Sequence, residues 1–515
     1  MFKNIQKYLL INHPLLWNLK IVPVSAFLIL FNIIFILLGY LNGAIDFTET
    51  DNDYSRNDND DIIIFFSVMI SILTAIVWLV YYLKNNALKS YYPKNNFSLF
   101  KEWLLILVVC FLNSSLIMAY LYGKDLKVRS YYTESEAKKR CEILSQGSFF
   151  VSGSYSYHYN GDNYEGDAIV AAANYDVDTA TAVVDSVKVK DHFFYRGRKY
   201  SNFSLLDKNI NSYSFFGYNE DSLRKMKIKD WLFYNKKDSV KSLFKNYLAI
   251  VKEHKLKANI DEDKWTELVY DYPKFEKYKN IGAEEFEVSY DYENEIRRNQ
   301  IDTSEQYVKK VKDTYYLYNK YYVPENSLKH SYETISNSWT KPSVSIDTIL
   351  LLLYIAIGFS LVLFSFRVTS GRNFLIAIVA LGVLNILIGI LTAIISSEYF
   401  YLAALLLLTI ILFVYLILVI HRKKGKGISG ITLNATLWLL PSFGPIVYAI
   451  VLELAKSTTN YYEIIDIGLR NEKFPFISFL KDYAYELLWF NVLFIFLMMI
   501  FFSRKIKQWR GIAEN

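Results

Sequence analysis

FLIAIVALGVLNILIGILTAII, residues 374–395, contains no charged side chain and is one of eight long apolar stretches in the chain. Its 22 residues would extend about 33 Å as an α-helix, at about 1.5 Å per residue. That length matches a hydrocarbon core of about 30 Å, so the stretch predicts a transmembrane helix. The other predicted spans are Val22–Asn42, Ile62–Leu83, Trp103–Tyr122, Thr348–Phe366, Phe400–Ile420, Ile431–Leu452 and Ala484–Phe502.

The composition is that of a membrane protein. Hydrophobic residues make up 53 % of the 515 residues and charged residues 21 %, and the apolar residues are concentrated in the predicted spans. This distribution excludes a soluble enzyme, a fibrous protein and a disordered chain. Cys110 lies in a span and Cys141 lies outside the spans, so no disulfide is expected between them.

Basic residues mark one side of the membrane. Segments rich in Lys and Arg stay in the cytoplasm. The residues before 22, the loop after span two, the turns after spans four and six, and the tail are basic. Loop 43–61 instead carries seven acidic residues and one Arg. The pattern predicts a multi-pass protein of the bacterial inner membrane with both termini inside. The same basic segments explain the net charge of +6, because they contact the anionic headgroups of the lipid bilayer. No nucleic-acid partner is therefore expected.

The predicted fold class is a polytopic α-helical membrane protein with an extracytoplasmic α+β domain inserted between spans three and four. An amphipathic helix at the inner interface is expected before the first span, which serves as an uncleaved signal. The predicted parts are the interfacial helix 1–21, spans one to three in 22–122, the extracytoplasmic domain 123–346, spans four to eight in 347–503, and a basic cytoplasmic tail 504–515.

Within 123–346 we expect strands first and helices after them. Alternation of side chains and turn residues predict strands over 148–159, 168–175, 180–190 and 192–200. A capping box at Thr133 predicts a short helix before them. A 3.6-residue apolar stripe predicts a helix over 238–254, and weaker patterns predict helices over 262–270 and 304–322.

Uncharged polar residues in the spans give two candidate functional features. Side chains aligned on one helix face predict either close helix packing or a lined substrate path: Asn32, Ser67, Ser71, Thr74, Gly382, Asn385 and Gly389. In span seven, two prolines with glycine between them predict a kink or a broken helix, which transporters use at substrate sites. The candidate gate residues are Asn434, Thr436, Pro441, Ser442, Gly444 and Pro445.

No motif predicts a reaction. The six His residues lie outside the spans and show no helical zinc spacing, and the predicted span interiors lack the charged groups of an ion relay. We therefore expect no catalytic residue, no cofactor and no metal. Acidic loop 43–61, with Asp51 and Asp53, loosely resembles the first external loop of membrane glycosyltransferases that use lipid-linked sugars, and this keeps a third function open.

The predicted cytoplasmic loops are too short to fold alone, so ATP-driven work would need a separate ATPase. The candidate docking residues are Lys84, Lys89, Lys94, Lys101, Arg422, Lys423, Lys424 and Lys426. The layout of three spans, an external domain and further spans is similar in outline to permease subunits of bacterial lipid-exporting ABC systems, which have three later spans rather than five.

The first hypothesis is therefore a non-catalytic permease or export subunit. The alternative is a membrane receptor or assembly factor whose external domain binds an envelope protein, a peptide or a glycan; its clustered tyrosines suit such a surface. The substrate and the oligomeric state stay open.

Overall fold

The computed structural model describes residues 2–13, 16–17, 19–49, 58–84, 97–151, 192–201, 204–271, 273–275, 281–289, 307–311, 314–395, 398–422, 428–458 and 475–508. The chain divides into two compact units. The first, here called the helical unit, consists of Met1–Leu38, Asn59–Tyr122 and Val344–Asn515. The second, here called the inserted unit, consists of Gly39–Asp58 and Gly123–Ser343.

The long apolar helices fit a multi-pass membrane protein. In the described residues, seven helices are long and apolar enough to cross a membrane, and the number is eight if the bent pair α5–α6 counts as one span. Their ends lie within seven residues of those of the predicted spans: α3 Ile21–Asn42, α4 Asp58–Lys84, α5 Ser98–Ser114, α6 Leu116–Arg129, α13 Ile346–Val368, α14 Gly371–Ile395, α15 Glu398–Arg422, α16 Ile428–Thr458 and α19 Ala484–Gln508.

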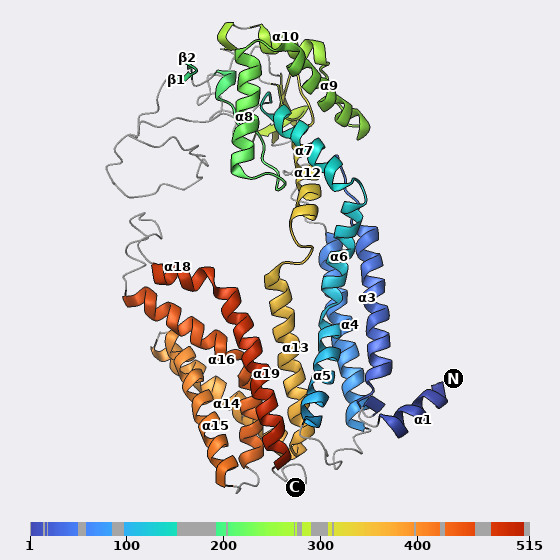
Figure 1. Ribbon diagram of the computed structural model, residues 1–515, viewed down its shortest axis with the longest axis vertical. Helices are drawn as coiled ribbons and strands as arrows, with labels where there is room; N and C mark the ends of the chain where they lie inside the picture. The colour runs from blue at the N-terminus through green and yellow to red at the C-terminus, as the bar shows by residue number, and fades with distance from the viewer. Residues whose placement is uncertain are drawn as a thin grey trace. The chain divides into compact units, whose positions relative to one another are not determined.

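Packing in the helical unit is centred on α13 and α16. Helix α13 packs against α5 and α16, and α16 also packs against α14, α15 and α19 (Figure 1). Trp103 of α5 is fully buried, and its indole nitrogen donates to Ser360 Oγ of α13 at 3.0 Å. Helix α14 instead exposes most of its apolar side chains, as a helix that faces lipid does.

Two shorter helices complete the helical unit. Helix α1, Phe2–Asn12, occupies the segment where an amphipathic helix is predicted. Helix α18, Pro475–Asp482, precedes α19 and contacts α16, and its Ile477 and Leu480 are buried. The sequence analysis did not predict α18.

The inserted unit is built around helices with one buried apolar face. They are α7 Glu134–Ser148, α8 Tyr218–Phe233, α9 Lys237–Glu253, α10 Glu262–Tyr270 and α12 Glu325–Thr340, with short 3₁₀ turns η1 Leu205–Asp207 and η2 Pro273–Phe275. The predicted capping of α7 is confirmed, because Thr133 Oγ1 accepts from Glu136 N. The apolar stripe of α9 is buried as predicted, and Phe244 stacks on Trp265 of α10 with ring centroids 4.1 Å apart.

The strands of the inserted unit form two small antiparallel sheets. Strands β1 His192–Tyr195 and β2 Arg198–Ser201 form a hairpin, because Arg196 and Gly197 have positive φ angles of 46° and 76°. The second sheet has the order β3-β5-β4, with β3 Phe286–Ser289, β4 Tyr307–Val311 and β5 Thr314–Tyr318. The strand predicted over 192–200 is therefore a hairpin.

Three predictions for this unit need correction. The helix predicted over 304–322 is wrong, since β4 and β5 pair there; Val, Thr and Tyr favour strands. The strand predicted over 148–159 does not begin at Ser148, where α7 ends. The expected order of strands before helices holds for β1 and β2, which precede α8–α10, but not for β3–β5, which follow α10. The strands predicted over 168–175 and 180–190 lie outside the described residues.

Candidate functional site

The third predicted span is bent in its middle. Helix α5 ends at Ser114 and α6 begins at Leu116, and their axes differ by 49°. The hydroxyls of Ser114 and Ser115 donate to the backbone oxygens of Phe111 and Leu112, at 3.1 and 3.0 Å. Side chains that bond the preceding turn in this way bend helices. A bent helix pair is thus found in span three, where no break was predicted.

Polar side chains of α3 and α4 converge on this bend. Asn32 Nδ2 donates to Leu112 O at 3.2 Å, and Asn32 Oδ1 lies 2.9 Å from Ser115 Oγ and shares its one proton with Leu112 O. Ser71 Oγ donates to Asn113 O at 2.8 Å, and Asn113 Nδ2 returns a bond to Ser71 O at 3.0 Å. These four bonds define the bend cluster: Asn32, Ser71, Asn113 and Ser115. Two of the four residues, Asn32 and Ser71, were predicted path residues.

The remaining predicted residues of α4 lie close to the cluster. Ser67 is buried and donates to Ile64 O within its own helix at 2.7 Å. Thr74 lies one turn beyond Ser71 and lines the groove between α3 and α4. Asn113 Oδ1 is buried and has no hydrogen-bond partner among the described residues. The bend cluster therefore retains an unused acceptor inside the bundle.

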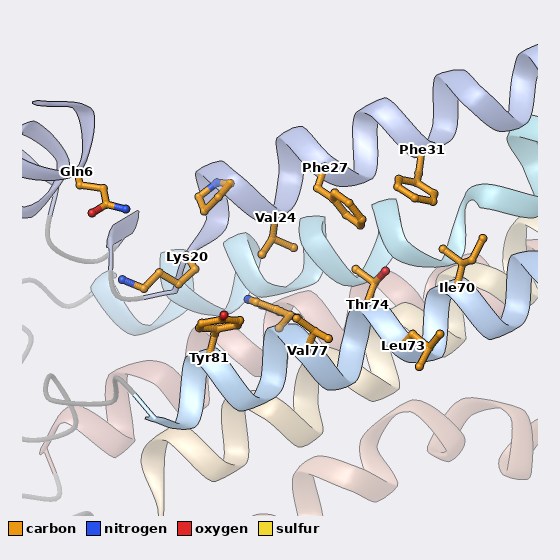
Figure 2. A pocket seen from close by; sticks show the side chains of 12 residues that line it. Gln6, Lys20, Val24, Phe27, Phe31, Ile70, Leu73, Thr74, Val77 and Tyr81 are labelled. Carbon is orange, nitrogen blue, oxygen red and sulfur yellow. The ribbon is translucent and has the colours of Figure 1, made fainter. Parts of the chain in front are cut away.

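The groove between α3 and α4 is a cavity within the helical unit. It has a volume of about 670 Å³, and side chains of α3 and α4 point into it from opposite sides (Figure 2). Lys20 and Gln6 lie at one end, and Phe31 and Ile70 lie at the other (Figure 2). Apart from Gln6, Lys20 and Thr74, its lining consists of proline, aliphatic and aromatic residues.

Helix α16 is continuous through both of its prolines, which corrects the expected break. Pro445 has no N–H to donate to Pro441 O one turn earlier. Asn491 of α19 supplies the missing donor, because its Nδ2 donates to Pro441 O at 3.0 Å and to Tyr354 OH at 2.9 Å. Gly444 makes room for this contact. The neighbouring helix therefore satisfies the backbone, and the helix persists.

The other candidate gate residues of α16 do not form one site. Asn434 is fully buried and its Oδ1 accepts from Thr369 Oγ1 at 3.0 Å, two turns from Pro441. Thr436 and Ser442 bond backbone oxygens of their own helix. A gate at these residues stays a prediction.

On α14, the predicted packing face meets few neighbours. A side-chain carbon built at Gly382 or Gly389 would have no other heavy atom within 4 Å among the described residues. Asn385 Oδ1 accepts a hydrogen bond from Tyr401 OH of α15 at 2.9 Å.

A buried ion pair joins α5 and α13. Arg367 Nε lies 3.0 Å from Glu102 Oε1, and the two side chains are 6 % and 3 % exposed. Both residues lie one position outside the predicted spans, which is why sequence reasoning placed no charge in the bundle. Their pairing satisfies charges that would each be costly to bury alone.

Most of the predicted docking residues lie outside the described structure. Lys89, Lys94, Lys423, Lys424 and Lys426 are outside it, and the side chains of Lys84 and Arg422 are not described. Lys101, in the first turn of α5, is exposed.

The acidic loop does not form a metal site in the described residues. Asp51 and Asp53 lie outside them, and Asp60 accepts a hydrogen bond from Tyr120 OH of α6. The described residues contain no group of three or more His, Cys, Asp or Glu side chains placed to hold a metal ion.

The inserted unit buries a separate polar cluster. Lys208 is fully buried and its ammonium donates to Val151 O at 2.6 Å. Burial lowers the pKa of Lys208 to about 7, opposed by the negative charge of Glu325. Burial also raises the pKa of Glu325, whose carboxylate accepts from Asn211 Nδ2. Lys208 and Glu325 are buried, so we assign the cluster to the core of the unit.

Segment Gly39–Asp58 is attached to the inserted unit through Phe47. The Phe47 ring stacks on His254 with centroids 3.7 Å apart, and His254 Nε2 lies 3.0 Å from Tyr332 OH. Arg140 places its guanidinium 4.2 Å from the Tyr132 ring centroid and pairs with Glu253 at 2.8 Å. Part of loop 43–61 therefore belongs to the folded core and not to a free solvated loop.

Sequence reasoning missed Asn113, Ser115, Lys20 and Asn491. A signal existed for the first two, because Asn113-Ser114-Ser115 is a polar run in the middle of an apolar span. Asn491 could not be recognised, since its role depends on packing against Pro441. No protein-family model, curated protein or solved structure matches the chain.

Proposed function

We propose that the chain is a non-catalytic permease or export subunit of the bacterial inner membrane that works with a separate ATPase. The observation that carries this proposal is the bend at Ser115, where polar atoms of α3, α4 and the α5–α6 pair meet inside an apolar bundle. Interrupted helices at membrane depth line substrate sites in transporters. The bend cluster supplies uncharged donors and acceptors at such an interruption.

The energy that holds the bend is small enough to be overcome by a coupled partner. Interhelical hydrogen bonds in membranes average about 0.6 kcal/mol each, so the four bonds of the bend cluster contribute roughly 2–3 kcal/mol. A ligand or partner that favours another arrangement by this amount changes the populations substantially. We propose that the bend is the element that moves.

The proposed orientation places both termini in the cytoplasm and the inserted unit outside. Under it, Lys84–Lys101 and Arg422–Lys426 face the cytoplasm, where they are the proposed contacts of the ATPase. The asymmetry of basic residues supports this orientation.

The proposal is tested by measuring the activity of an ATPase that co-purifies with the full chain. We expect tagged protein extracted from its native membrane into nanodiscs to carry ATPase activity. Charge reversal at Lys423, Lys424 and Lys426 together should lower this activity at least ten-fold, while Lys245→Glu, an exposed control in α9, leaves it unchanged. Wild-type protein without accompanying hydrolysis, or equal hydrolysis in both variants, would contradict the proposal.

A second candidate function is a receptor or assembly factor, favoured by exposed apolar residues on α8. Leu223 and Met226 lie three residues apart on this helix and are 66 % and 51 % exposed. If the inserted unit binds a protein, Leu223→Asp with Met226→Asp should abolish capture of that protein, and Asn219→Asp on the same helix should not. Capture that persists in the double variant would argue against this function.

A further inference from the structure

The groove between α3 and α4 has the length of one bilayer leaflet. Its lining on α3 runs from Lys20 to Phe31, and on α4 from Tyr81 to Ile70. Each run covers twelve residues, and the eleven steps between its first and last residue correspond to about 16 Å along a helix at about 1.5 Å per residue. Half of a hydrocarbon core of about 30 Å is about 15 Å. The groove therefore reaches from the edge of the apolar region to about its centre.

Among the described residues that line the groove, Lys20 is the one cation, and it lies at the end of the groove where α3 begins. Lys20 precedes the first residue of α3, and its ammonium lies 3.7 Å from the Trp17 ring centroid. No acidic side chain of the described residues forms an ion pair with it. Partial burial lowers the pKa of Lys20, so an anion beside the ammonium would stabilise the charge that the protein alone leaves uncompensated.

The end of the groove near Lys20 is held in place. Trp78 of α4 is buried, and its indole nitrogen donates to Leu19 O at 2.9 Å. This bond ties the turn before α3 to α4. Lys20 itself has a positive φ of 52°, a conformation that is rare outside glycine and that persists only where the surroundings determine it. The backbone at Lys20 is therefore held at the end of the groove, and the ammonium packs on the Trp17 ring.

We propose that the groove is a binding site for one acyl chain of an anionic phospholipid, with Lys20 at the lipid phosphate. The lining favours a flexible chain over a partner helix. Helices that pack closely in membranes present small residues to one another, whereas this groove is lined by bulky side chains such as Phe27, Phe31, Leu73 and Val77 (Figure 2). The proposal does not depend on transport, because a bound lipid of this kind would be a resident component.

Native mass spectrometry of the full chain tests the proposal. The protein is reconstituted into nanodiscs of equal parts phosphatidylglycerol and phosphatidylcholine and then released, and the retained lipid is identified. We expect one phosphatidylglycerol to be retained in preference to phosphatidylcholine. Lys20→Gln should lower that preference about five-fold, which is the effect of one interfacial lysine, about 1 kcal/mol. Lys101→Gln, at the start of α5, should leave it unchanged.

A second pair of variants separates the groove from general lipid contact. Val77→Trp fills the groove and should abolish retention, while Ile76→Trp places the same ring on a neighbouring position outside the lining. The two residues are similarly exposed, at 54 % and 52 %. Equal retention in all variants, retention of both lipids alike, or a second protein chain cross-linked to a photoreactive residue at position 77 would overturn the proposal.

Discussion

Glu102 and Arg367 show how a charge is accommodated among the apolar helices. The two side chains are almost completely buried and pair at 3.0 Å between α5 and α13. A buried ion pair gains attraction but loses hydration, so its net contribution to stability is small. Removing only one partner lowers the stability strongly, because the remaining charge stays buried without an opposite charge beside it. The pair therefore specifies how α5 packs on α13 more than it stabilises the bundle.

This reasoning predicts a non-additive pair of substitutions. Arg367→Met should destabilise the protein by about 3–5 kcal/mol, because Glu102 would remain buried and unpaired. Adding Glu102→Leu should restore most of the loss. The measurement is the thermal unfolding midpoint of the purified full chain for both single variants and the double variant. Additive losses in the double variant would show that the pair is not coupled.

Lys208 predicts a pH dependence of the inserted unit. Its pKa is about 7 in the folded protein and about 10.4 in an unfolded chain. Between these values the unfolded state binds more protons, so the folding free energy from this group becomes more favourable as pH rises from about 7 to about 10.4.

The matching variant is Lys208→Met, which cannot ionise. Its stability relative to wild type should be highest near pH 7 and fall by about 2 kcal/mol by pH 9. Lys252→Met, an exposed control on α9, should show no such trend. The measurement is the temperature at which half of the inserted unit becomes sensitive to protease, determined at pH 7, 8 and 9. A difference that is constant with pH would mean that Lys208 is charged throughout.

At the scale of elements, α16 shows why two prolines do not break a helix. Proline removes one backbone donor and crowds the preceding turn, and the cost is met when a neighbouring side chain bonds the freed oxygen. Asn491 of α19 has this role at Pro441. Its close approach requires glycine at 444, where an added side-chain carbon would lie 2.5 Å from Asn491 Oδ1.

Gly444→Ala should therefore destabilise the full chain by about 1–3 kcal/mol through overpacking. Gly389→Ala on α14 is the matched control, because open space surrounds that position; it should be neutral or stabilising by up to about 1 kcal/mol. Thermal midpoints of the two variants decide the point. Equal effects would mean that contact with Asn491 does not constrain position 444.

The elements that could be predicted are those determined by local pattern. The spans follow from uninterrupted apolar length, and α9 and the cap of α7 follow from periodicity and spacing. The bend at Ser115 was missed because apolar residues flank its polar run on both sides. Strands β4 and β5 were predicted as a helix because the pairing of β5 with β3, which completes their sheet, is a long-range contact.

The candidate site was predicted only in part, for a related reason. The sequence identifies a polar face on α3 and α4 through Asn32 and Ser71, but it does not show which residues pack against that face. Asn113 supplies one of those partners only once α5 and α6 pack beside α4. Lys20 was counted only as a basic residue before the first span. The groove beside it forms only when α3 and α4 pack together.

At the scale of the whole molecule, we propose a multi-pass chain in which the bent α5–α6 pair crosses the membrane once. Span number and the location of the inserted unit both depend on this crossing. Lys101 lies at the start of α5, and Ser135 lies in α7 of the inserted unit, and both are exposed. If α5–α6 crosses, these two residues lie on opposite sides of the bilayer.

The most direct measurement is labelling of single cysteines with a membrane-impermeant maleimide in intact spheroplasts, in a chain with Cys110 and Cys141 replaced by serine. Ser135→Cys should be labelled at once, and Lys101→Cys should be labelled only after the membrane is permeabilised. Labelling of both positions before permeabilisation, or of neither, would show that α5–α6 does not cross.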